Sequence, residues 1–162
     1  MTPNPVQVAA VDWVPTVAAK SAEGFTYLDL LTAVDRPAAE QFEIVLRLVR
    51  LGDAQDHADA WLRTSIDRAA PAIDSLTGVL PAASWHEREI HEMFGIDFAG
   101  HPDLRPLLLA TGHGMHPLRK ETPLVARVET PWPGAAGQET GRRTRRASLP
   151  PGVPAAWVRE KS

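Results

Sequence analysis

The sequence predicts an α+β domain: a small antiparallel sheet with helices packed on one face, plus an extended C-terminal arm. Three observations predict it. Apolar and polar residues alternate in residues 42–51, which is the period of a half-buried strand. Residues 84–95 combine a helix cap, mixed charged and apolar residues and a terminal glycine. Beyond residue 124, prolines, glycines and arginines leave no periodic pattern.

The chain divides into three segments. Residues 1–24 are an N-terminal helical or irregular segment, in which an alanine-rich stretch predicts a short helix ahead of the sheet. Residues 25–124 form the α+β domain, and residues 125–162 form an extended basic tail rich in proline and arginine. Within the domain, residues 25–34 and 42–51 predict two strands, which a linker of about seven residues joins as an antiparallel pair.

The second half of the domain predicts one more strand and two helices. Residues 61–67 read as the strand, and residues 71–74 as a break after it. Asp74 or Ser75 can then cap a short helix over residues 76–80.

Ser84 is the predicted N-cap of the longer helix, because it stands three residues before Glu87, the spacing of a capping box. Gly95 is the predicted terminator. The helix also carries His86 and His91, which are five positions apart. An ideal helix rotates that pair by about 140°, so the two side chains diverge. Glu87 and His91 share a face, but two ligands do not make a metal site.

Catalytic chemistry finds little support in the sequence. No nucleophile constellation, phosphate loop or dinucleotide fingerprint accompanies the glutamates and histidines of the longer helix. One alternative stays open, an independent small metal-dependent enzyme that uses Glu87, His91 and a loop histidine. The metal content of the purified protein discriminates it, since a docking protein is expected to hold none.

Composition sets further bounds. The 162 residues suit a single domain with appendages. The chain has no cysteine, which excludes disulfides, thiolate zinc sites and cysteine-ligated iron–sulfur clusters on it. No apolar stretch approaches the roughly 20 residues that span a bilayer, and the first residues do not read as a secretory signal. Any association with a membrane is therefore expected to be indirect, through a partner.

Charge is distributed unevenly along the chain. Residues 126–162 carry seven basic and three acidic residues, a balance of +4, so a net charge of −3 leaves −7 on the rest. The acidic body disfavours nucleic acid, although the basic run from Arg142 to Arg146 keeps a nucleic-acid-binding module as a minor alternative. Trp132 and Trp157 indicate either an arm that lies on a partner or one that folds back on its own domain.

The segment 85–105 is the most informative of the chain. Carboxylates, arginines and histidines alternate there with large apolar residues such as Ile90, Met93 and Phe94. A solvated face needs few large apolar residues, and a core needs few ions. A surface that docks permanently against another protein accommodates both, because partner groups satisfy the charges when water leaves.

Several blocks in a fixed order also carry a resemblance. The chain resembles the C subunit family, also called the thirty-kilodalton family, of respiratory NADH:quinone oxidoreductase (complex I). The matching blocks are Tyr27 to Asp35, Phe42 to Val45, Glu87-Arg88-Glu89, Met93-Phe94-Gly95-Ile96, Gly100 to Arg105 and His116 to Lys120. Glu92 stands where the family usually has aspartate, and His91 where tyrosine is common. These exchanges leave the branch of the superfamily open.

The resemblance implies a cofactor-free structural subunit of the peripheral arm. Such a protein docks to the large D subunit near the quinone site and lies close to the B subunit, while FMN and iron–sulfur clusters are held by other subunits. It supports electron transfer from NADH to quinone coupled to proton translocation, on the cytoplasmic face of the bacterial plasma membrane. It binds no small-molecule substrate itself. The alternative is the equivalent small subunit of a related membrane-bound [NiFe] hydrogenase.

On this interpretation the chain has no catalytic, cofactor-binding or metal-binding residue, and its functional residues dock partners. The charges of the helix are expected to pair with arginines of this chain or with another subunit. The predicted docking residues are Glu87, Arg88, Glu89, Met93, Phe94, His101, Asp103, Arg105, His116, Arg119, Lys120 and Trp132.

Overall fold

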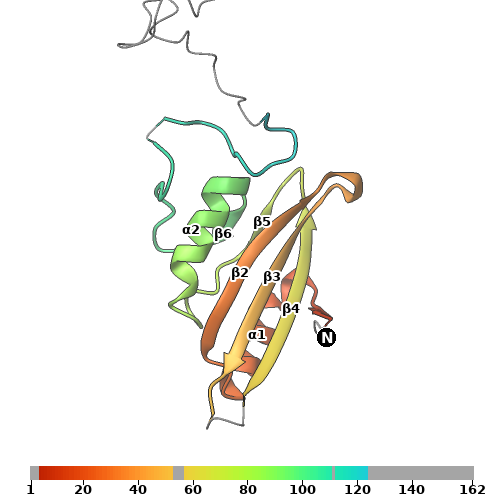
Figure 1. Cartoon of the computed structure of the whole chain (residues 1–162), viewed down its shortest axis with the longest axis vertical. Helices are drawn as coiled ribbons and strands as arrows, with labels where there is room; N and C mark the ends of the chain where they lie inside the picture. Colours follow the sequence, from red (N-terminus) through yellow and green to blue (C-terminus); the bar gives the residue numbers. More distant parts are fainter. Residues whose placement is uncertain (1–3, 53–56, 111, 124–162) are drawn as a thin grey trace, which may run out of the picture. The chain divides into compact units, whose positions relative to one another are not determined.

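The computed structural model describes residues 4–52, 57–110 and 112–123. The C-terminal arm, with Trp132, Trp157 and the Arg142–Arg146 run, lies outside the described residues. Within the described part the fold is α+β, as the sequence predicts, and Figure 1 shows the two helices and the long strands.

The main sheet has the strand order β1-β4-β3-β2. Strands β2 (Tyr27–Arg36), β3 (Gln41–Arg50) and β4 (Ala58–Asp67) form an antiparallel meander. Strand β1 (Val6–Gln7) pairs with β4 in parallel. The sheet is therefore mixed, and the expectation of a purely antiparallel sheet is corrected at this edge. A two-residue strand is too short to have a period that sequence reasoning could detect.

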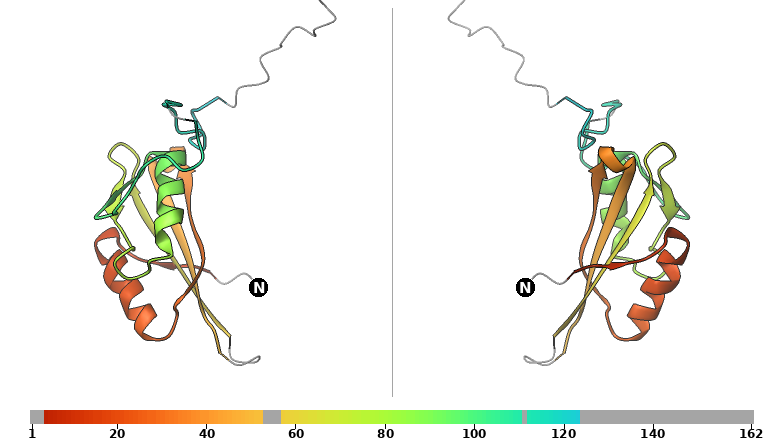
Figure 2. Two further views of the ribbon diagram at one scale, coloured as in Figure 1. Left: turned by 90° about the vertical axis from the view of Figure 1, so that its left-hand side faces the viewer. Right: turned by 90° about the vertical axis from the view of Figure 1, so that its right-hand side faces the viewer.

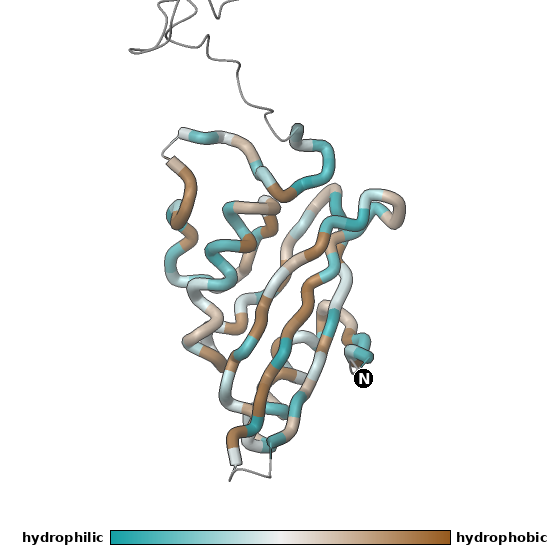
Figure 3. Tube along the Cα trace, viewed as in Figure 1, coloured by the Kyte–Doolittle hydropathy of each residue, from teal (hydrophilic) through white to brown (hydrophobic). Residues whose placement is uncertain are grey.

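The alternation predicted for the central strand is confirmed on the side that faces the core. Phe42, Ile44, Leu46 and Leu48 of β3 are fully buried, and Figure 3 shows brown stretches interrupted by teal along the long strands. Strand β2 shifts its register between Leu28 and Leu30, so Leu28 pairs with Leu48 while Leu31 pairs with Leu46. The bulge thus keeps leucines on the core face on both sides of the irregularity.

The predicted N-terminal helix is present. A 3-10 turn, η1 (Ala10–Asp12), leads into α1 (Trp13–Ala22), which buries Trp13 and Val17. A second 3-10 turn, η2 (Pro37–Ala39), connects β2 to β3.

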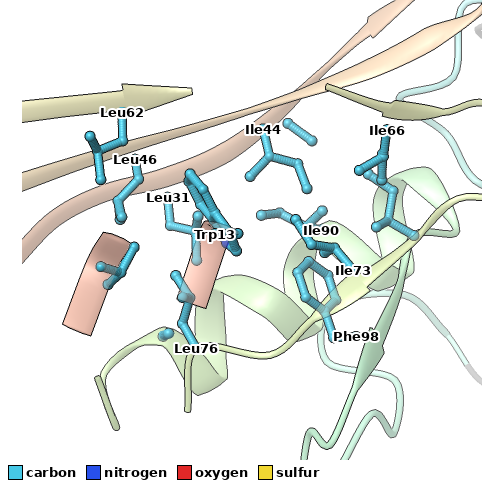
Figure 4. Close-up of a cluster of buried hydrophobic side chains, with 14 of the residues drawn as sticks. Trp13, Leu31, Ile44, Leu46, Leu62, Ile66, Ile73, Leu76, Ile90 and Phe98 are labelled. Atoms are coloured by element: carbon cyan, nitrogen blue, oxygen red, sulfur yellow. The ribbon is translucent and has the colours of Figure 1, made fainter. Parts of the chain in front are cut away.

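The second helix, α2 (Ala83–Phe94), lies on the same face of the sheet as α1 (Figure 2). Both helices contribute to one hydrophobic core, which includes Trp13 of α1, Leu46 of β3 and Ile90 of α2 (Figure 4).

Two local predictions around α2 are wrong. Residues 76–80 form a turn instead of a helix, with Leu80 N–H donating to Leu76 O at 2.7 Å. The expected break at 71–74 is strand β5 (Ala72–Asp74), which pairs in parallel with β6 (Asp97–Ala99). These three-residue strands flank α2 and bury Ile73 and Phe98 in the core, a long-range pairing that local sequence does not encode.

The predicted N-cap of α2 is also corrected. The helix begins at Ala83 with Ala82 at the cap position and no side-chain cap, so Ser84 lies inside the first turn. The carboxylate of Glu87 bonds elsewhere, as described below. The terminator is confirmed, since Gly95 ends the helix in the left-handed region at φ 70°. In the described part of the chain, no helix is long and apolar enough to cross a membrane.

Candidate docking surface

Helix α2 has one face in the core and one on the surface. Glu87, Ile90 and Phe94 are buried, whereas Trp85 and Glu89 are exposed. Trp85 stands out, because 68% of its surface is exposed. An indole in water is an unfavourable arrangement for an isolated protein and a common one for an interface anchor.

Glu87 acts inside the domain. Its side chain is fully buried and accepts hydrogen bonds from Leu76 N–H at 2.7 Å and from Ser75 Oγ at 2.6 Å. Burial raises the pKa of the Glu87 carboxyl, and these two hydrogen bonds only partly oppose that effect. Glu87 therefore holds the turn that replaces the expected helix at 76–80.

Arg88 attaches α2 to the loop that follows β6. Its Nε donates to Arg105 O and its Nη2 to Pro106 O, each at 3.0 Å. In the same loop, Arg105 Nη2 contacts Asp103 Oδ2 at 2.7 Å, and the Arg105 guanidinium holds the pKa of Asp103 well below its ordinary value. His101 adds a ring-nitrogen contact to Ser84 O at 3.1 Å, so the loop is attached to the first half of the helix at two points.

Glu92 fixes the continuation of this loop. Its carboxylate accepts the N–H groups of Leu108 at 2.7 Å and Leu109 at 2.9 Å. Burial acts to raise the pKa of Glu92, but these backbone donors prevail and hold it below its ordinary value. The arrangement presents Leu108 to solvent, with 60% of its surface exposed.

The segment 116–122 closes over the end of α2. His116 Nδ1 contacts Glu92 O at 2.9 Å, and Leu118 N–H donates to Met93 O at 3.2 Å. Arg119 Nε donates to Phe94 O at 2.6 Å, while its guanidinium lies 5.3 Å from the centre of the Phe42 ring. These last carbonyls of the helix are thereby satisfied by groups of a later segment.

Asp35 joins this segment to the sheet. Its side chain is fully buried and accepts Arg68 Nε at 2.8 Å and Lys120 N–H at 2.8 Å. Arg68 also contacts Glu121. The Arg68 guanidinium lowers the pKa of Asp35, so the carboxylate stays ionised inside the protein.

A pocket of about 270 Å³ lies between α2 and residues 104–110 and 112–116. Its lining is mainly apolar and includes three histidines, and Met115, which also lines it, is 47% exposed. The principal lining residues are His91, Leu104, Leu109, His113, Met115 and His116. Across the described residues, no group of three or more histidine, aspartate or glutamate side chains is placed to hold a metal ion.

The structure brings most of the predicted docking residues into this region, and they differ in how far their side chains are buried. Glu87, Met93 and Phe94 are buried in the domain. The partly buried residues that bond within the chain are Arg88, His101, Asp103, His116 and Arg119. The exposed residues are Glu89, Arg105 and Lys120, and Trp132 lies outside the described part.

The predicted docking residues left out the apolar half of this surface. Trp85, Leu108, Met115 and Leu118 are all large, apolar and at least 47% exposed. For Trp85 a signal existed, because it stands four residues before the charged Glu89 and so shares its face of the helix. We refer below to Trp85, Arg88, Glu89 and Leu108 together as the α2 surface.

Residues 6–128 match the sequence model of a family described as the 30 Kd subunit of respiratory-chain NADH dehydrogenase. The chain belongs to this family. Relatives include the C subunit of NADH-quinone oxidoreductase from Rhodobacter capsulatus, which is 44% identical over 107 residues. That match covers 65% of this chain and 51% of the relative. The mitochondrial 30.4 kDa subunit of NADH-ubiquinone oxidoreductase from Neurospora crassa is 36% identical over 110 residues, covering 67% of this chain and 38% of the relative.

The C subunit of the Moorella thermoacetica enzyme is 39% identical over 102 residues, which is 63% of this chain and 67% of the relative. The chain thus spans only about half the length of many of the C subunits that it matches. A relative from Methylococcus capsulatus carries the combined designation C/D, and the match covers 18% of it at 39% identity.

Solved structures share this fold. A trypsin-resistant fragment of Nqo5, residues 1–134, superimposes with a TM-score of 0.55 at 28% identity, covering 60% of this chain and 80% of the fragment. A chain of an archaeal membrane-bound sulfane sulfur reductase gives a TM-score of 0.66 at 23% identity, covering 77% of this chain and 76% of the other. The second likeness establishes the fold alone.

Proposed function

We propose that this chain is a structural subunit of the peripheral arm of a complex I-type NADH:quinone oxidoreductase and that it docks to the large D subunit, with the B subunit nearby. It holds no cofactor, and FMN and iron–sulfur clusters reside on other subunits. Electrons pass from NADH to quinone through those chains, coupled to proton translocation. The protein itself is peripheral, on the cytoplasmic face of the membrane.

The observation that carries this proposal is the α2 surface. Trp85 and Leu108 are two large apolar side chains exposed at 68% and 60%, and Arg88 is held beside them by two backbone carbonyls. Preorganised tryptophan and arginine side chains are the residue types that contribute most to binding energy in protein interfaces. A mixed apolar and charged surface of this kind supports permanent docking better than catalysis.

A second observation supports the D subunit as the partner. The Methylococcus capsulatus relative is named as one protein, C/D. Two domains joined in one chain have a high effective concentration for each other, so such a fusion is compatible with a direct contact between them. The absence of cysteine from this chain supports the cofactor-free role, since it cannot ligate a cluster through thiolates.

The experiment replaces Trp85 by alanine in the native host and measures the amount of assembled complex on native gels. Val11→Ala is the matched control, because Val11 is 81% exposed and lies in η1, outside α2 and outside the long strands. We expect Trp85→Ala to lower assembly several-fold, with NADH:quinone turnover per assembled complex unchanged. Normal assembly with selectively lost turnover would contradict the proposal and indicate a catalytic role.

Purification through a tag on this chain tests the identity of the complex. Copurification with flavin and iron–sulfur subunits, together with NADH-dependent quinone reduction, is the expected result. A nickel-bearing partner with hydrogen-oxidising activity would assign the chain to the hydrogenase branch instead. A lone, metal-loaded chain would contradict docking altogether.

A further inference from the structure

The face of the main sheet opposite the two helices is uncovered by any described helix or strand. Figure 1 views the sheet from this side, and Figure 2 shows both helices beyond it. The pairing register aligns its side chains in rows across β2, β3 and β4. These rows are Leu30–Arg47–Trp61, Thr32–Val45–Arg63 and Val34–Glu43–Ser65. We call this set of residues the open sheet face; its members are half-buried, and most are apolar or hydroxyl-bearing.

The acidic groups around the open sheet face are already paired. Arg47 contacts Asp29 through Nη1 at 2.7 Å and Asp59 through Nη2 at 2.8 Å. Glu43 lies 3.5 Å from the guanidinium of Arg36. Each of these three carboxylates therefore already has an arginine partner, although Asp29 and Asp59 share Arg47.

Arg63 is different. It occupies the middle row of β4, and among the described residues no carboxylate lies within ion-pair distance of it. Arg63 is therefore the charged side chain of the open sheet face that has no ion-pair partner among the described residues, and its charge is positive. An approaching surface that complements it must bring negative charge.

Hydrogen-bond donors reinforce the same requirement. Arg63 Nε and Trp61 Nε1 are shielded from solvent and have no acceptor among the described residues, and the same holds for Arg47 Nε. All three groups are donors only, so the buried N–H groups of the open sheet face lack acceptors and add to its positive potential around Arg63. The indole of Trp61 is in turn covered by Arg47, whose guanidinium carbon lies 5.3 Å from the ring centre.

We propose that the open sheet face is a second docking surface, which takes an acidic segment of another protein. A carboxylate of that segment pairs with Arg63, and its neighbouring side chains pack on Val34, Val45 and Trp61. This surface lies on the side of the sheet away from the helix that carries the α2 surface. It requires a partner of defined charge whether or not the α2 surface docks the D subunit.

Charge also rules against the other occupants. A second copy of this chain would bring another unpaired Arg63 against the first, and each acid near its own open sheet face already has an arginine partner. Residues 126–162 of the same chain have a balance of +4 and would repel the arginine. Nucleic acid is disfavoured because the remainder of the chain carries −7.

The test uses photo-crosslinking in the assembled native complex. p-Benzoylphenylalanine replaces Thr32, which lies in the same row as Arg63, and mass spectrometry identifies the crosslinked peptide. We expect a peptide of another subunit that contains aspartate or glutamate. Crosslinks to a second copy, to residues 124–162, to a basic segment or to nothing would each overturn the proposal.

Substitutions at Arg63 supply the second readout. Arg63→Glu should reduce the yield of that crosslink at least several-fold, Arg63→Gln should reduce it less, and Arg63→Lys should largely retain it. Replacing the crosslinked acid by lysine in the Arg63→Glu background should restore the yield. An unchanged yield in both Arg63→Glu and Arg63→Gln would overturn the proposal. Trp85→Ala tests the α2 surface separately, because it leaves the charge at Arg63 intact.

Discussion

Gly95 shows how one residue joins α2 to the segment that closes over it. Its φ of 70° is unfavourable for any residue with a Cβ, and a Cβ there would lie 2.5 Å from His116 Nε2 and 2.8 Å from Arg119 Nη2. The backbone conformation alone costs about 1–2 kcal/mol in other residues. Displacing two side chains that are themselves hydrogen-bonded adds roughly 1–3 kcal/mol.

We therefore expect Gly95→Ala to lower the free energy of unfolding by about 3 kcal/mol, measured by urea denaturation. Gly100→Ala is the matched control, because Gly100 has a similar φ of 82° with nothing within 4 Å of its Cβ position. It should lose only the backbone contribution. Equal losses in the two variants would show that the contact with His116 and Arg119 does not matter.

Thr64 places a hydroxyl where an apolar group would be more stable. Its side chain faces the core, is fully buried, and its Oγ1 has no hydrogen-bond partner among the described residues. Thr64→Val keeps the shape and removes the unsatisfied group, so the free energy of unfolding should rise by about 1 kcal/mol. Thr32→Val, at a half-buried position on the open face of β2, should change it little. A loss of stability in Thr64→Val would show that the hydroxyl has a partner.

For single residues, the sequence predicted the backbone conformation better than it predicted side-chain contacts. A glycine after an amphipathic run indicates a helix end, and Gly95 confirmed it. The spacing of Ser84 and Glu87 also matches a capping box, yet the Glu87 carboxylate bonds to Ser75 and Leu76. The turn at residues 75–76 packs against α2 and takes the carboxylate oxygens of Glu87 that a capping box would use. The local sequence pattern gives no sign of this tertiary contact.

At the scale of elements, α2 depends on a carboxyl group that burial disfavours in its charged form. Burial raises the pKa of Glu87 above its ordinary value of 4.5. Glu87 therefore binds a proton more tightly in the folded state than in the unfolded chain. The stability that this difference contributes is complete only below pH 4.5, where Glu87 is protonated in both states. That contribution is lost as the pH rises through the higher folded-state pKa.

Glu87→Gln should consequently flatten the decline of stability between about pH 4.5 and neutrality. Unfolding midpoints measured across this range test it. Glu89→Gln, on the exposed face of the same helix, is the control for removing one negative charge. Parallel pH profiles for wild type and Glu87→Gln would contradict the role assigned to this carboxyl.

The long strands were predictable, and the short ones were not. Residues 42–51 were expected and β3 is Gln41–Arg50, because one buried face imposes a strict period on ten residues. Strands β1, β5 and β6 have two or three residues, and each is stabilised by pairing with a strand distant in the sequence. The turn at 76–80 has leucines at helical spacing, but Glu87 binds its first N–H group, that of Leu76.

At the scale of the whole molecule, Asp35 and Arg68 connect the sheet to residues 116–122. Arg68→Ala removes the ion pair with Asp35 and the contact to Glu121 together. We expect faster hydrogen exchange at Lys120 N–H and its neighbours, because the buried carboxylate loses its compensating charge. Arg36→Ala, which breaks the pair between an exposed arginine and the half-buried Glu43, should leave exchange there unchanged. Equal exchange in both variants would show that Arg68 does not hold the segment.

Acid should loosen the same connection. Arg68 lowers the pKa of Asp35 below its ordinary value of 3.8, so its stabilising contribution is present above that pH and is lost as the pH falls through the folded-state pKa. Below pH 3.8, exchange of the 116–122 amides in the wild type should approach that of Arg68→Ala. Persistent protection well below that pH would contradict this.

The acceptor for Lys120 N–H is 85 positions earlier in the chain. During synthesis the meander from β2 to β4 leaves the ribosome well before that donor has been made. The nascent sheet thus carries the carboxylate of Asp35, whose hydrogen bonds are completed only when Lys120 has been made. A chain released before residue 120 would retain its strands but lack this last cover, and cellular quality control would encounter it as an incomplete product.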